Sequence, residues 1–100
     1  MIFFDFDWDA KKVRANLKKH QVSFRLATAV FNDPLAVTIF DEEHSDNEER
    51  WVTIGRVPNS TVLVVVHTTI QVSNTELHIR IISARRADRE EMRNYEQTPR

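Results

Sequence analysis

Three arginines lie on segments whose neighbours alternate as in β-strands. Arg50 and Arg56 are six residues apart, so a regular strand places them on one face, and Arg80 lies between Ile79 and Ile81 in another strand-like run. A guanidinium stays charged and binds two phosphate oxygens through its planar fork. We therefore expect the three arginines to converge on a sheet surface and stabilise charge developing on a phosphate. The alternative is ion pairing with the acidic segment before Arg50.

Cleavage of a phosphodiester without a metal ion also needs a base and an acid. His67 ends an apolar run and has the most suitable intrinsic pKa, and Glu49 beside Arg50 is a candidate base. Each has a structural alternative: a histidine at a strand end is often satisfied locally, and a loop carboxylate often pairs with a neighbour. His44 and His78 have weaker claims.

Five further residues are candidates for contacts with a nucleic-acid backbone. Lys19 and His20 lie at the end of a predicted helix, where capping of the helix C-terminus is the alternative role. Arg85 and Arg86 follow the last predicted strand and could hold a phosphate, with the hydroxyl of Ser83 nearby. Their alternative is a strand-to-helix connection in which the arginine stems pack over the core.

The composition excludes several kinds of site. The chain has 100 residues and no cysteine, which excludes disulfides, thiolate metal sites and a cysteine nucleophile and fits a reducing cytoplasm. Gly55 is the only glycine, so Walker and dinucleotide-binding motifs are absent. The acidic segment lacks the glycine and ligand spacing of an EF-hand. We expect no metal, no cofactor and no membrane span, since no apolar run approaches the roughly 20 residues needed.

Charge is segregated along the chain although the net charge is only −1. Residues 11–25 contain six lysines and arginines without an acidic residue, and residues 33–49 contain seven acidic residues without a lysine or arginine. The basic run is either a solvated helix face or a surface that meets RNA or an acidic partner segment. We expect acidic segments of a protein partner to be attracted there.

Periodicity and turn residues predict the elements that hold these side chains. Residues 2–6 form a short strand, and Asp7 or Asp9 caps a helix that extends to about Lys19 with its apolar positions at Ala10, Val13 and Leu17. Residues 24–31 form a second helix, capped by Ser23, and residues 89–96 form a last helix that opens with a capping box of Asp88 and Glu91.

Strands are predicted at residues 35–40, 50–56, 61–69 and 76–84, and residues 41–49 form an acidic loop. The turn residues between the last three strands indicate an antiparallel meander. The expected fold is therefore α+β: a single domain of residues 1–100, with helices packed on one face of a four- or five-stranded, mostly antiparallel sheet.

Several short segments together resemble the BrnT toxin family in their order and approximate spacing. They are Phe6-Asp7-Trp8-Asp9, Asn16, Lys19-His20, Val22-Ser23-Phe24, Phe31-Asn32-Asp33-Pro34-Leu35-Ala36, His44-Ser45, Glu48-Glu49-Arg50, Ile54-Gly55-Arg56, Val64-Val65-Val66-His67-Thr68 and Arg80-Ile81-Ile82-Ser83-Ala84-Arg85-Arg86. Gln21 stands where the family commonly has glycine, so the helix end needs either another way to turn or a strained left-handed residue there.

The resemblance implies a RelE-like fold and a cytoplasmic, metal-independent endoribonuclease of a bacterial type II toxin–antitoxin system that inhibits translation. It also implies neutralisation by a BrnA-type antitoxin in a heterotetramer, with operator DNA contacted only through the antitoxin. The alternative function is a catalytically weak binding module that acts mainly as an antitoxin-binding co-repressor, which the near-neutral charge and the acidic last helix favour. Toxicity on expression without the antitoxin would distinguish the two.

Overall fold

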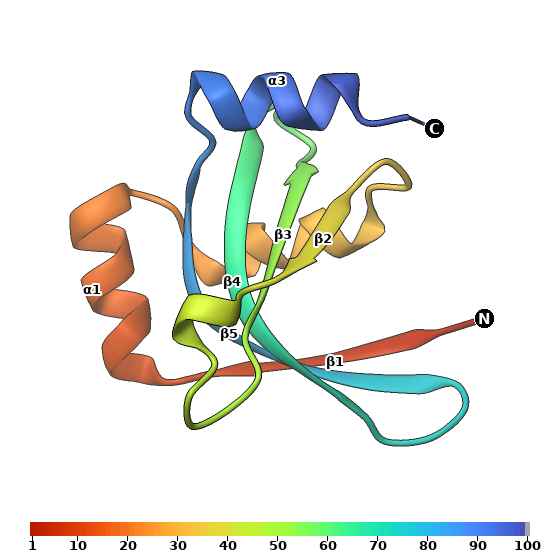
Figure 1. The fold of residues 1–100 in the computed structure, drawn as a ribbon. Coiled ribbons are helices and arrows are strands. Elements are labelled where there is room, and N and C mark those ends of the chain that lie inside the picture. Colours follow the sequence, from red (N-terminus) through yellow and green to blue (C-terminus); the bar gives the residue numbers. More distant parts are fainter. Residues whose placement is uncertain (100) are drawn as a thin grey trace.

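The computed structural model describes residues 1–99, and Figure 1 shows its arrangement. The elements follow the order β1 (Phe3–Trp8), α1 (Ala10–His20), α2 (Phe24–Ala27), η1 (Thr28–Asn32), β2 (Val37–Phe40), η2 (Glu42–His44), β3 (Trp51–Arg56), β4 (Val62–Gln71), β5 (Glu76–Arg86) and α3 (Arg89–Gln97). The sheet has five strands in the order β1-β5-β4-β3-β2. β1 is parallel to β5 and the other pairs are antiparallel, which confirms the predicted α+β class.

The helix caps agree with the sequence. Asp9 caps α1, Ser23 caps α2, and Asp88 forms a capping box with Glu91 at the start of α3. Gln21 has a φ of 58°, so of the two alternatives at this helix end the chain uses the left-handed residue. The second helix differs from its predicted form because only its first turn is α-helical and the rest is the 3₁₀ segment η1.

The inner face of α1 differs from the predicted apolar stripe. Leu17 is 44% exposed, whereas Asn16 is buried and Val13 packs against the core. The reason is tertiary, because the helix turns a hydrogen-bonding side chain toward the edge of β5. The apolar spacing alone therefore predicted the helix but assigned Leu17 to the wrong side.

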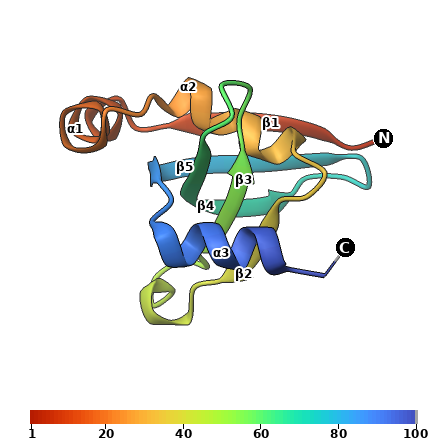
Figure 2. The ribbon, with the colours of Figure 1, turned by 90° about the horizontal axis from the view of Figure 1, so that it is seen from above.

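Helices cover both faces of the sheet, as Figure 2 shows for α2 and α3. On the first face, α2 and η1 bury Leu63 and Val65 of β4 in the main core cluster. On the second face, Val62 and Val64 of β4 pack with Tyr95 of α3. The expectation that all helices lie on one face is therefore wrong, because the alternating side chains of β4 are apolar on both sides and each side needs a cover.

Candidate functional site

The second face of the sheet is covered by α3 at one end only, which Figure 1 shows across the top of the sheet. Strand register identifies the side chains that share the uncovered part. Ser83 pairs with Val66, and Arg80 pairs with Thr68. Val66 and Thr68 are two and four residues along β4 from Val64, so they lie on the same face as Val64, which α3 covers. We call this surface, formed by Asp7, Arg50, Thr68, Arg80 and Ser83, the open face.

Arg80 points out of the core as its sequence neighbours predicted. Ile79 and Ile81 are buried on the first face, while the side chain of Arg80 is 52% exposed. Its Nε lies 3.8 Å from Oδ1 of Asp7, which belongs to the adjoining strand β1. That carboxylate oxygen is buried and accepts no hydrogen bond from residues 1–99. Arg80 is thus held loosely, and its guanidinium has capacity for an anion.

Arg50 lies in the same row of the open face. Trp51, the first residue of β3, pairs with His67, and continuing this register by one residue places Arg50 level with Thr68, the residue that pairs with Arg80. At the usual spacing between strands, the Cα atoms of Arg50 and Arg80 are about 10 Å apart. Nε of Arg50 is buried without a hydrogen-bond partner in the described part of the chain, and its Nη2 lies 4.0 Å from Glu48. Two guanidiniums with unused donors therefore flank one point on the sheet.

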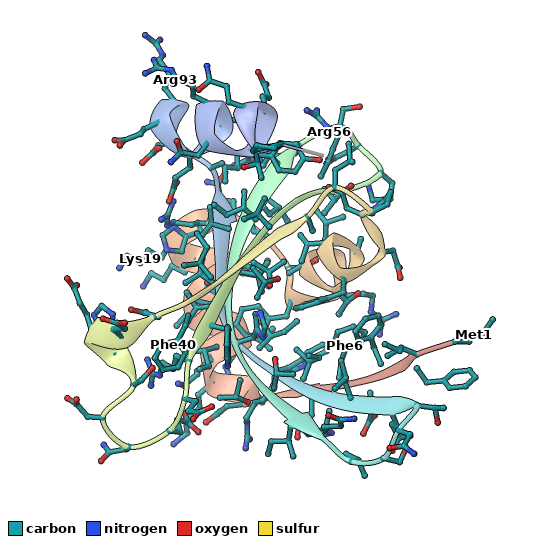
Figure 3. The ribbon with its side chains drawn as sticks, turned by 45° about the vertical axis from the view of Figure 1, so that its right-hand side comes forward. Met1, Phe6, Lys19, Phe40, Arg56 and Arg93 are labelled. Atoms are coloured by element: carbon teal, nitrogen blue, oxygen red, sulfur yellow. The ribbon has the colours of Figure 1, made fainter. Side chains whose placement is uncertain are left out.

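Arg56 does not join them, which corrects the expectation that three guanidiniums converge. It pairs with Val62, six residues along β4 from Thr68, or about 20 Å away. Its guanidinium lies over the ring of Tyr95, 5.6 Å from the centroid, and donates to the carbonyl oxygen of Ser60 at 2.8 Å. Figure 3 shows Arg56 near α3, at the opposite end of the sheet from Phe6. Its contacts stabilise the turn and the helix.

A groove runs between α1 and β5 beside the open face. It measures about 280 Å³ and is lined by Lys12, Ala15, Asn16, Lys19, His20, Ile82 and Ser83. Three of the residues predicted to contact nucleic acid, Lys19, His20 and Ser83, therefore lie together. Lys19 is exposed and His20 is half-buried, so both are accessible to a ligand. Ser83 belongs to the groove and to the open face, which makes the two surfaces continuous.

Asn16 positions this groove. β1 pairs with β5 only as far as Ile81, and beyond that residue α1 takes the place of a strand along the edge of β5. Nδ2 of Asn16 donates to the carbonyl oxygens of Ala84 and Val22 at 2.8 and 2.9 Å, and its Oδ1 accepts from the backbone N–H of Ala84 at 3.1 Å. The side chain thus replaces a strand partner and aligns α1 with β5. Sequence reasoning missed this role because Asn16 stands among exposed cations.

Arg85 and Arg86 do not form the expected phosphate clamp. Arg85 donates two hydrogen bonds to Glu91, both of 2.7 Å. This pairing raises the pKa of Arg85 and lowers the pKa of Glu91. Arg86 pairs with Leu63, a residue of the first face, and is exposed at the strand end. The structure therefore supports the structural alternative for Arg85 and separates Arg86 from the open face.

His67 lies on the first face, on the other side of the sheet from Arg80. It is 1% exposed, its Nε2 is 2.7 Å from the hydroxyl of Thr53, and its Nδ1 is 3.1 Å from the hydroxyl of Thr69. Its ring packs on the edge of Phe31 with centroids 4.9 Å apart. Burial lowers the pKa of His67 to about 4. This placement contradicts the prediction that His67 transfers protons at the same site as Arg80.

Two other histidines have carboxylate partners. Nδ1 of His78 is 2.9 Å from Asp5 and its Nε2 is 3.3 Å from Asp7, so the ring ties β5 to β1. The hydrogen bond with Asp5 is the largest cause that raises the pKa of His78. His44 is exposed and lies 3.0 Å from Asp41 in the acidic loop. Only the pairing of β1 with β5 brings Asp5 to His78, and nothing in the sequence indicated it.

Glu49, the candidate base, is exposed at the end of the acidic loop, immediately before Arg50. The adjoining groove of about 360 Å³ is lined by Glu43, His44, Asp46, Asn47, Glu48 and Arg50. Glu49 thus lies at the border of the open face, and its role as a base stays a prediction. Among residues 1–99, no three histidine, cysteine, aspartate or glutamate side chains are grouped so that they could hold a metal ion.

This geometry is that of a small α+β protein with two arginines on an open sheet surface, bordered by a basic helix and an acidic loop. A sequence profile described as the ribonuclease toxin BrnT of a type II toxin–antitoxin system matches residues 8–91, and the chain belongs to that family. The family implies an antitoxin partner.

A solved structure supports the fold. The 1.1 Å crystal structure of the Brucella abortus ribonuclease toxin BrnT matches with a TM-score of 0.60 and 19% sequence identity, covering 87% of this chain and all of that one. No curated protein sequence is a significant match. No helix within residues 1–99 is long and apolar enough to cross a membrane. The relation to RelE stays a prediction.

Proposed function

We propose that this toxin cleaves RNA without a metal ion, with the scissile phosphate on the open face. The observation that carries the proposal is the row of Arg50, Thr68 and Arg80, in which two guanidiniums flank one point and keep unused donors. Guanidiniums can stabilise the charge that develops on phosphorus in place of a metal. The groove with Lys19 and His20 extends this surface along the RNA backbone.

In the proposed reaction a base takes the proton of the 2′-hydroxyl and the 2′-oxygen attacks phosphorus. The bond from phosphorus to the 5′-oxygen breaks, and an acid protonates that leaving oxygen, which leaves a 2′,3′-cyclic phosphate. Glu49 beside Arg50 and His20 beside Ser83 are the proposed proton-transfer groups, because both border the open face and are accessible. His78 is less suited, since each of its ring nitrogens already has a carboxylate partner.

Replacement of Arg80 tests the proposal. Arg80→Ala should reduce RNA cleavage about a hundredfold or more, because loss of one transition-state donor costs about 3 kcal/mol. Arg80→Lys should restore activity only in part, since an ammonium group cannot provide the bidentate fork. The matched control is Arg93→Ala, which removes an exposed arginine from α3, a helix that contributes no residue to the open face; Figure 3 shows Arg93 on this helix. A folded Arg80→Ala protein with normal activity per molecule would refute the assignment.

Metal independence has a separate test. Cleavage of a defined RNA by the purified chain should be unchanged by a molar excess of EDTA, because the arginines supply the positive charge. Loss of cleavage in EDTA that magnesium restores would contradict the proposed metal-independent mechanism. It would not contradict the proposal that RNA binds on the open face.

We also propose the cellular setting that the family suggests. The chain acts in the cytoplasm and inhibits translation, a BrnA-type antitoxin neutralises it in a heterotetramer, and operator DNA is contacted only through that antitoxin. Induction of the chain alone should arrest incorporation of labelled amino acids, and co-expression of the antitoxin should relieve the arrest.

A catalytically weak, antitoxin-binding co-repressor is the second candidate. The pairing of Arg85 with Glu91 favours it, because that ion pair removes one arginine from the cations available to RNA. Under this function the purified chain would bind the antitoxin normally, and its uncoupled expression would not inhibit growth.

A further inference from the structure

β2 is the edge strand of the sheet beside the acidic loop, and β3 is its only strand partner among residues 1–99. The backbone N–H of Asp41 donates to the carbonyl oxygen of Arg50 at 2.9 Å, just beyond the strand. Hydrogen-bonded pairs alternate in an antiparallel ladder, so the N–H and C=O groups of Thr38 and Phe40 point away from β3. The edge therefore offers four backbone groups to another strand.

An apolar groove follows this edge under the C-terminal turn of α3. It measures about 320 Å³ and is lined by Val37, Ile39, Ile54, Asn94, Tyr95, Gln97 and Thr98. Ile39 is 54% exposed and Phe40 is 37% exposed, although both belong to a regular strand. A second groove, lined by residues 34–37 with Thr98 and Pro99, adjoins the first at Val37. An added strand would cover apolar side chains that now contact water.

The charge beside the edge restricts what can bind. β2 itself has no charged residue, and residues 41–49, which follow it, contain six acidic residues and no lysine or arginine. A segment that pairs with β2 would bring one of its ends to this loop. Lysine or arginine at that end would be attracted, and acidic residues would be repelled.

We propose that β2 receives an extended segment of the antitoxin as a sixth strand, with apolar side chains in the groove and basic residues against residues 41–49. The proposal rests on the antitoxin partner of this family and is independent of RNA cleavage. The exposed surface of α1 is the competing site. Its lysines and arginines are charged, but its backbone groups are already paired within the helix, and several of its side chains line the groove proposed for RNA.

The test compares two isoleucines that are similarly exposed on strands. Ile39→Asp should weaken binding to the purified antitoxin at least thirtyfold in calorimetry, because Ile39 lies at the centre of the proposed contact. Ile70→Asp is the matched control, since Ile70 is 61% exposed on β4, away from the groove, and should leave binding unchanged. Thermal melts establish that both variants fold.

Hydrogen exchange tests the strand pairing itself. Amides of Thr38 and Phe40 should exchange much more slowly in the antitoxin complex than in the free chain, because carbonyl oxygens of the added strand would accept hydrogen bonds from these N–H groups. In cells, the co-expressed antitoxin should no longer relieve the growth inhibition caused by the Ile39→Asp toxin. RNA cleavage by the purified variant should stay normal.

Other outcomes would overturn the proposal. The first is that Ile39→Asp binds the antitoxin with unchanged affinity while a charge reversal in α1, such as Arg14→Glu, abolishes binding. The second is that amide exchange at Thr38 and Phe40 is the same in the complex as in the free chain. Because binding and exchange are measured without RNA, a chain that proved not to be a nuclease would refute the proposed cleavage and leave this test intact.

Discussion

Acidification should destabilise this protein through His67, the buried histidine of the first sheet face. Its pKa is about 4 in the folded chain and 6.5 ordinarily, so the unfolded chain binds a proton more readily between these values. The contribution of the neutral imidazole to the free energy of unfolding is therefore fully present above pH 6.5 and is lost as the pH falls toward 4. The difference corresponds to about 2 kcal/mol of unfolding free energy at pH 5 and about 3 kcal/mol at pH 4.

The measurement is urea denaturation of the wild-type chain and of His67→Gln between pH 7.5 and pH 5. Glutamine keeps a polar partner for Thr53 but does not titrate, so His67→Gln should lose about 2 kcal/mol less stability over this range. His78, whose pKa is raised, contributes in the opposite direction, but it is present in both proteins and its effect cancels. Equal pH dependence in the two proteins would refute the reasoning, whatever the stability of the variant at pH 7.5.

Two substitutions test the contacts that place the helices. Asn16→Ala should lower the free energy of unfolding by about 2 to 4 kcal/mol in urea denaturation, since the buried N–H and C=O of Ala84 lose their partner; a change below 1 kcal/mol would show that water replaces the amide. Gly55→Ala should destabilise by about 1 to 3 kcal/mol, because an added Cβ would lie 3.0 Å from Cβ of Val30 and 3.1 Å from its carbonyl oxygen. An unchanged melting temperature for Gly55→Ala would mean that η1 moves away from β3 without cost.

Local patterns in the sequence were sufficient to predict most elements and their ends. Asp9, Ser23 and Asp88 cap helices in the structure because a side chain that accepts from the first turn acts within three residues. The position of Arg80 between two buried isoleucines was also predictable, since side chains alternate along a strand whatever lies beside it.

Relations between strands were beyond the reach of such patterns. Arg56 shares its face with Arg50 but lies about 20 Å from Arg80, because strand register sets Arg80 level with Arg50, at the other end of β3 from Arg56. His67 is buried because η1 places Phe31 over it, and His78 has two carboxylate partners because β1 pairs in parallel with β5. Each of these relations involves residues distant in the chain, and sequence periodicity carries no information about which segments pair.

The sequence by itself therefore determined the elements, the segregation of charge and the resemblance to the BrnT family, since these depend on residues near one another or on their order. Only the tertiary structure decided which cations share a surface. Asn16 aligns α1 with β5 and brings Lys19 and His20 to Ser83, while strand register brings Arg50 to Arg80. The physical reason is that side chains converge through packing and backbone pairing between distant segments, which local spacing does not specify.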